Sequence, residues 1–187
     1  GTGGVDQDLI HIHHLVREGP ILPRADVDGD GEPDVVFIGE MRDYETIASA
    51  LTIAETGHLV FATLHTNSAA QSIDRIVDVF PEEQQKQVKL QLSNVIEAVF
   101  SQRLIAGTQK GRVVAYEVML GSTAVKTAIR EGKTHQIESI LETSSEIGMA
   151  TLEKSLATLV KNGETTLEEA ESWSLRPEEL MRLVRGV

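Results

Sequence analysis

Two short apolar runs separated by a helical pattern constrain this chain more than any other feature. The runs at 35–38 and 59–64 are too short for helices and rich in β-branched and aromatic residues, which is typical of buried parallel strands. Between them Ile47, Leu51 and Ala54 recur at helical spacing. A strand, a helix and a second strand in this order predict a right-handed parallel crossover unit.

Polar and charged residues follow each of these two predicted strands. Glu40 comes shortly after the first strand, and His65 comes directly after the second. Ligands of open α/β sheets bind beyond the carboxyl ends of the strands, so we expect Glu40 and His65 to lie at one site. Arg42 and Asp43 follow Glu40, and we expect these two to form an ion pair that fixes the loop after the strand.

The composition is that of an ordinary globular chain. Its 187 residues suffice for one domain core, and 41% are hydrophobic and 25% charged. No apolar run approaches the ~20 residues that span a bilayer, so we expect no direct membrane insertion. A net charge of −12 argues against a nucleic-acid surface, which needs clustered basic residues. The absence of Cys excludes disulfides and cysteine metal sites, and is compatible with the cytosol.

An acidic loop precedes the first predicted strand. Asp26, Asp28 and Asp30 alternate before Asp34, with glycines between them, as in loops that bind Ca²⁺. The full EF-hand pattern requires Glu at the twelfth position, which here is Phe37. A solvated acidic turn and a weak Ca²⁺ site both remain open for these four aspartates.

The rest of the chain predicts one strand pair among helices. We expect strands over 102–106 and 112–120, and helices over 68–77, 81–100, 123–131, 135–143, 149–161, 167–172 and 177–185. Thr166 and Glu169 have the spacing of a capping box, in which each side chain bonds the other's backbone amide.

Several longer motifs carry a family resemblance. Residues 39–43, Gly-Glu-Met-Arg-Asp, resemble the Walker B segment of the secretion and pilus ATPases, and residues 56–67 resemble their His box. The similarity extends over about 32–187, and residues 124–131 are similar to a motif of the retraction branch. The assembly ATPases usually carry a tetracysteine zinc site, which this chain lacks. The chain therefore resembles the type IV pilus retraction ATPases, the PilT family.

The resemblance implies a fold and an activity. The fold class is α/β, a partial RecA-like P-loop ATPase core with a parallel sheet and flanking helices, followed by an all-helical C-terminal subdomain. We expect an atypical segment over 1–33, the core over 34–120 and the helical subdomain over 121–187. The implied activity is ATP hydrolysis with Mg²⁺ to power pilus retraction. The implied partners are further copies in a hexamer and the pilus inner-membrane platform protein, in the cytoplasm at the bacterial inner membrane.

The resemblance also assigns roles to residues. It makes Glu40 the group that activates water, His65 the contact on the γ-phosphate side, and Arg75 a cation near the nucleotide or a subunit interface. The other implied cofactor-binding residues are Gly39, Arg42, Asp43 and Thr66. The residues implied in pilus retraction, without a part in hydrolysis, are Ile129, Arg130 and Glu131.

One element of the family is missing from the sequence. No Gly-x-x-x-x-Gly-Lys-Ser/Thr run occurs, and this is the loop whose amides and Lys hold the phosphates. We expect weak nucleotide binding without it, because charge-assisted contacts carry much of the affinity for phosphate. Two hypotheses follow: the C-terminal part of a hexameric retraction motor, or an inactive fragment that serves as an oligomerisation or interaction module, with Ca²⁺ at 26–34.

Overall fold

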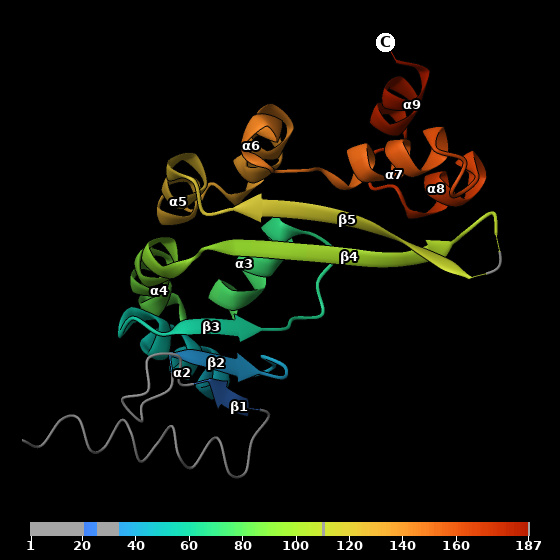
Figure 1. Ribbon diagram of the computed structural model, residues 1–187. Helices are drawn as coiled ribbons and strands as arrows, with labels where there is room; N and C mark the ends of the chain where they lie inside the picture. The colour runs from blue at the N-terminus through green and yellow to red at the C-terminus, as the bar shows by residue number, and fades with distance from the viewer. Residues whose placement is uncertain (1–20, 26–33, 110, 187) are drawn as a thin grey trace, which may run out of the picture. The chain divides into compact units, whose positions relative to one another are not determined.

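The computed structural model of the chain describes residues 21–25, 34–109 and 111–186 (Figure 1). These residues form two compact units. The first contains the described residues up to 65 together with 76–95, and the second contains 66–75 together with the described residues from 96 onward. The strand pair after residue 96 thus belongs with the C-terminal helices, which differs from the predicted boundary at 120.

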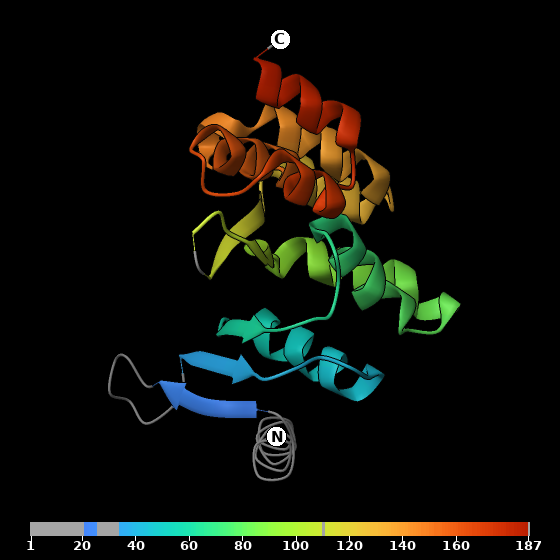
Figure 2. The same cartoon turned by 90° about the vertical axis from the view of Figure 1, so that its right-hand side faces the viewer.

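The first unit contains a three-stranded sheet in the order β1–β2–β3. Its strands are β1 (Ile21–Ala25), β2 (Val35–Ile38) and β3 (Leu59–Ala62). β2 and β3 are parallel, as the strand–helix–strand pattern predicts. β1 runs antiparallel to β2 (Figure 2), and the sequence analysis missed this strand.

One face of this sheet carries helix α2 (Tyr44–Glu55). Val36 and Ile38 of β2 are buried against Ala50 and Ile53 of α2. On β2 and β3, Phe37 and Phe61 are 40% and 51% exposed, and their rings stack at 5.1 Å. The expectation of fully buried strands is therefore wrong, because successive side chains point to opposite faces and Phe37 and Phe61 remain exposed.

The first unit also contains helix α4 (Glu82–Val95), which is shorter than the predicted helix over 81–100. Residues 98–106 instead form strand β4 (Ala98–Ala106), which pairs antiparallel with β5 (Arg112–Leu120) in the second unit. Val99 lies opposite the fully buried Met119. A ladder of nine residue pairs thus decides the conformation of a stretch whose apolar spacing also suits a helix.

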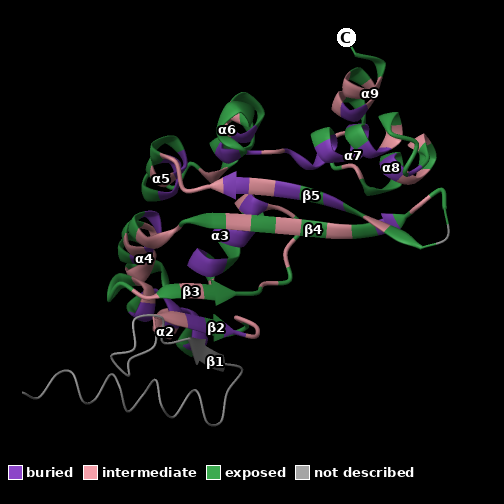
Figure 3. Cartoon of the chain, in the orientation of Figure 1, coloured by how far each residue is buried: buried purple, intermediate pink, exposed green. Residues whose placement is uncertain are grey.

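The second unit joins the β4–β5 hairpin to several helices. Burial alternates along β5 (Figure 3), and its buried Ala115 shares a core with Leu152 and Leu156 of helix α7 (Leu152–Lys161). The helices are α3 (Ala69–Asp78, of which 69–75 belong to this unit), α5 (Thr123–Arg130), α6 (Ile137–Thr143), α7 (Leu152–Lys161), α8 (Leu167–Trp173) and α9 (Pro177–Arg185). In the part of the chain that the structure describes, no helix has the length and apolarity that a membrane span requires.

Two local predictions in the second unit need correction. The helix expected from 149 begins at Leu152, because Ala150 forms a bridge with Val118 of β5. The capping box at α8 is only half formed. Thr166 accepts a hydrogen bond from the Glu169 amide at 3.2 Å, but the Glu169 carboxylate accepts from the Ala106 amide at 2.8 Å and so ties α8 to the end of β4.

Gly121 follows β5 at a point where no side chain fits. A Cβ at this position would lie 2.2 Å from the carbonyl oxygen of Ile96, a backbone atom that cannot move aside easily. We expect Gly121→Ala to lower the free energy of unfolding by about 3 kcal/mol, measured by urea denaturation. Gly107 near the other end of the hairpin has its nearest atoms at 3.4 Å, so Gly107→Ala should stay within about 1 kcal/mol of wild type. Equal losses in both variants would contradict the steric argument.

Candidate active site

A single carboxylate brings together the residues that follow the two parallel strands. One oxygen of Glu40, Oε2, lies 2.5 Å from Nη2 of Arg42, and the other, Oε1, lies 3.3 Å from Nε2 of His65. The Glu40 side chain is 22% exposed, whereas that of His65 is 85% exposed. The predicted meeting of Glu40 and His65 is confirmed, and the cluster opens to the surface of the first unit.

Backbone pairing extends past the strands and holds this cluster in place. The Met41 amide donates to the Thr63 carbonyl at 2.9 Å, and the Thr63 hydroxyl donates to the carbonyl of Gly39. Both bonds join the loop after β2 to the loop after β3. The residues on either side of Glu40 are therefore fixed relative to the chain that leads into His65.

The charges around Glu40 favour its ionised form. The hydrogen bond from Arg42 lowers the pKa of the Glu40 carboxyl most, and the charges of Arg42 and His65 lower it further, while desolvation opposes them. The carboxylate is therefore ionised at neutral pH. An ionised carboxylate beside a guanidinium can accept a proton from water while the guanidinium offsets developing negative charge.

Asp43 has a different partner from the one expected. Its side chain accepts a hydrogen bond from the Thr46 amide at 2.9 Å and caps helix α2, while Arg42 pairs with Glu40. The predicted Arg42–Asp43 ion pair is thus wrong. An Asp at the N-cap satisfies a free amide of the first helical turn, and this local bond fixes its side chain.

Thr66 and Arg75 belong to the second unit. The Thr66 hydroxyl lies 2.7 Å from the hydroxyl of Ser72, which is a structural contact within this segment. Arg75 is exposed in the last turn of α3.

The residues that resemble the retraction motif end helix α5. Ile129 is fully buried, Arg130 is exposed, and Glu131 pairs with Lys133 at 2.7 Å. Gly132 has φ +69°, and the Lys133 amide donates to the Ala128 carbonyl at 2.8 Å, which is the Schellman ending of a helix. Ile129 therefore belongs to the core, and the two charged residues lie at the surface.

The possible calcium loop lies mostly outside the described residues. Asp26, Asp28 and Asp30 belong to the segment that is not described, and Asp34 immediately precedes β2. Among residues 34–109 and 111–186, no group of three or more His, Asp or Glu side chains is arranged to hold a metal ion.

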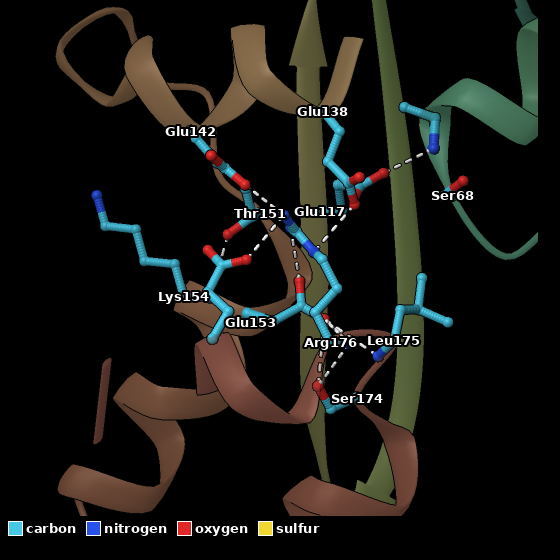
Figure 4. Close-up of polar contacts among 12 residues, drawn as sticks. Ser68, Glu117, Glu138, Glu142, Thr151, Glu153, Lys154, Ser174, Leu175 and Arg176 are labelled. Atoms are coloured by element: carbon cyan, nitrogen blue, oxygen red, sulfur yellow. Dashed lines mark hydrogen bonds and ion pairs between the residues drawn. The ribbon is translucent and has the colours of Figure 1, made fainter. Parts of the chain in front are cut away.

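The sequence analysis missed a second charged cluster, in the second unit. Arg176 pairs with Glu153 at 3.1 Å and also with Glu138 and Glu142 (Figure 4). It pairs with Glu179 at 2.7 Å as well. Nearby, Glu117 is 6% exposed on β5. A sequence signal for Glu117 does exist, because an acidic residue shares a strand face with the buried Ala115 and Met119.

Comparisons with known proteins show what this chain is similar to. Residues 31–108 match the family described as Type II/IV secretion system protein. The chain is 49% identical to the type IV pilus retraction ATPase PilT of Pseudomonas aeruginosa over 147 residues, which are 79% of this chain and 43% of that protein. It is 47% identical to a twitching motility protein of Neisseria gonorrhoeae, over 85% of this chain and 42% of the relative.

A solved structure is also similar to this chain. The crystal structure of the pilus retraction motor PilT with bound ADP has a TM-score of 0.74 and 47% identity, over 81% of this chain and 43% of that one. The predicted α/β ATPase-core fold is therefore confirmed. The chain spans less than half the length of the relatives it matches and corresponds to their C-terminal part.

Proposed function

We propose that this chain carries the water-activating side of an ATP-hydrolysis site. The chain belongs to the Type II/IV secretion system protein family and is a homologue of the pilus retraction ATPases. One observation carries the proposal: the Walker B-like Glu40 and the His-box residue His65 approach to 3.3 Å from the ends of two parallel strands. The bound ADP named for the related PilT structure supports a nucleotide as the ligand.

In this site Glu40 accepts the proton of the attacking water, for which its ionised state suits it. His65 contacts the terminal phosphate, since its ring is exposed while one nitrogen lies beside Glu40. Arg42, whose side chain is 74% exposed, stabilises negative charge that develops on the phosphoryl oxygens. Arg75, an exposed cation of the second unit, would serve at an interface with a neighbouring subunit.

The donors present fit one side of Mg-ATP. Carboxylate oxygens are ligands that Mg²⁺ takes, and Glu40 would supply one from the first unit. When bound, Mg²⁺ neutralises phosphate charge. No Gly-x-x-x-x-Gly-Lys-Ser/Thr run is present in these 187 residues, so the cradle for the other phosphates comes from a different segment. We propose that the whole motor is a hexamer that drives pilus retraction at the inner membrane through a platform protein.

Nucleotide titration tests this assignment. We expect Mg-ATPγS to shift the NMR signals of the Met41 amide and the His65 ring in the purified chain, with saturation only at high concentration because the phosphate loop is lacking. Mg-AMP, which has no terminal phosphate, serves as the matched ligand and should leave both signals in place. Equal shifts with the two nucleotides, or none with either, would refute a terminal-phosphate site at Glu40 and leave an interaction module as the function.

A further inference from the structure

Two charged side chains of the β4–β5 hairpin hold the backbone that continues from His65. The Glu117 carboxylate accepts a hydrogen bond from the Ala69 amide at 2.6 Å. The Arg103 guanidinium donates to the Asn67 carbonyl at 3.0 Å. We call Arg103 and Glu117 the backbone clamp. All four residues belong to the second unit, and the clamp begins two residues beyond His65.

The hairpin register places both clamp residues on one face. Glu117 lies opposite Ser101, and Arg103 lies opposite Ala115. Paired residues of an antiparallel ladder share a face, and that face alternates every second residue, so Arg103 and Glu117 point the same way. The charge of each side chain suits the group that it bonds. The Glu117 carboxylate accepts from an amide at the helix N-terminus, where the dipole favours negative charge. The Arg103 guanidinium donates to a carbonyl.

Glu117 is buried in a manner that packing alone does not explain. Its side chain is 6% exposed, and the amide that it accepts from belongs to the fully buried Ala69. Burial is the largest effect on the pKa of Glu117 and raises it, and the charges of Glu153 and Glu138 raise this pKa further. The hydrogen bond from the Ala69 amide and the charge of Arg176 lower it. An apolar residue would avoid this desolvation, so the hydrogen bond to Ala69 is the contact that the carboxylate specifically provides.

Arg103 is also fixed by a second contact. Its guanidinium carbon lies 5.9 Å from the ring centroid of Trp173 on α8, within the range of a cation–π interaction. Trp173 in turn donates to Glu169 at 2.9 Å. The donor to the Asn67 carbonyl is thus oriented by α8, just as Glu117 is oriented by β5.

We propose that Arg103 and Glu117 are positioning residues for the segment 66–75. This segment directly follows His65 and contains Thr66 and Arg75. Both residues belong to the second unit, whereas Glu40 belongs to the first. They act through the backbone, by fixing residues 67–69 and the start of α3 to the hairpin. Because residue 66 is joined directly to His65, these bonds restrict the backbone that continues from His65. The assignment of an ATP site to Glu40 and His65 is what gives this positioning a catalytic purpose.

The wild-type chain provides the first test. The Ala69 amide ¹⁵N shift, followed by NMR across pH, should titrate with the Glu117 carboxyl, with a midpoint above that of an exposed glutamate because the pKa is raised. The titratable and charged groups that face Glu117 are Glu138, Glu153 and Arg176. A flat titration curve at Ala69 would overturn the clamp without any variant having to fold.

Matched variants provide the second test. Glu117→Gln keeps the side-chain shape and removes the charge, so we expect amide hydrogen exchange at 69–72 to rise about tenfold and the His65 ring signals to shift. Glu171→Gln changes an exposed glutamate of α8 and should do neither. Arg103→Lys, which keeps the charge but not the planar donor, should move the Asn67 and Ala69 signals less than Arg103→Gln does.

Faster exchange at 69–72 with unchanged signals at His65 would overturn the positioning role and leave a structural bond. Unchanged exchange in both the Glu117 and the Arg103 variants would overturn the clamp itself. These measurements require no nucleotide. Failure of the clamp is therefore distinguishable from failure of the proposed ATP site, which the Mg-ATPγS titration tests separately.

Discussion

Glu40→Gln is expected to lower Mg-ATP turnover by the purified chain at least about 100-fold, because a neutral amide cannot accept the proton of the attacking water. Turnover is measured as released phosphate at high protein and Mg-ATP concentration, to offset weak binding. Glu45→Gln, at an exposed position in the first turn of α2, is the matched control and should retain wild-type turnover. Wild-type activity no greater than that of Glu40→Gln would contradict the role of Glu40 as the base.

The pH profile gives a second signature for Glu40. Arg42 lowers its pKa, so the base stays ionised through neutral pH, and its contribution to turnover is lost only as the pH falls through this lowered value. Arg42→Gln removes the main cause of the shift. The acidic limb of the profile should then move to higher pH, toward the usual pKa of a glutamate, and an unmoved limb would exclude Glu40 as the titrating group.

Arg176→Met is expected to destabilise the second unit by about 3 kcal/mol, in the range found when one partner of a buried ion pair is removed. The guanidinium joins carboxylates of α6, α7 and α9, and Glu153 is only 1% exposed. Without Arg176 these carboxylates lose their shared counter-charge. Urea denaturation measures the loss. Arg185→Met, at an exposed position in the last turn of α9, should change stability by less than about 0.5 kcal/mol.

The loss in Arg176→Met should depend on pH. Burial raises the pKa of Glu179 and of Glu117, and Arg176 partly counteracts both shifts, so its removal raises these pKa values further. A carboxyl with a raised pKa in the folded state contributes stability below its unfolded pKa, and this is lost as the pH rises through the folded value. The variant should therefore lose less stability at about pH 5 than at about pH 7. An equal loss at both would mean that packing dominates.

The sequence by itself determined the centre of the first unit. The β-branched run before Glu40, the helical spacing of Ile47 and Leu51, and the second run before His65 specify β2, α2 and β3 through local patterns. The parallel pairing of those strands then brings Glu40 and His65 to one edge. This part of the site was predictable because each step depends on residues close in the chain or on a fixed rule of sheet topology.

Tertiary structure alone decided the rest. The stretch from Ala98 to Phe100 has apolar residues at a spacing that suits a helix or a strand, and pairing with residues 118–120 selects the strand. The Glu117–Ala69 bond joins residues 48 positions apart, and Arg176 meets Glu142 across 34 positions. Such contacts depend on which residues packing brings together. A local sequence pattern carries no information about partners that lie so far apart in the chain.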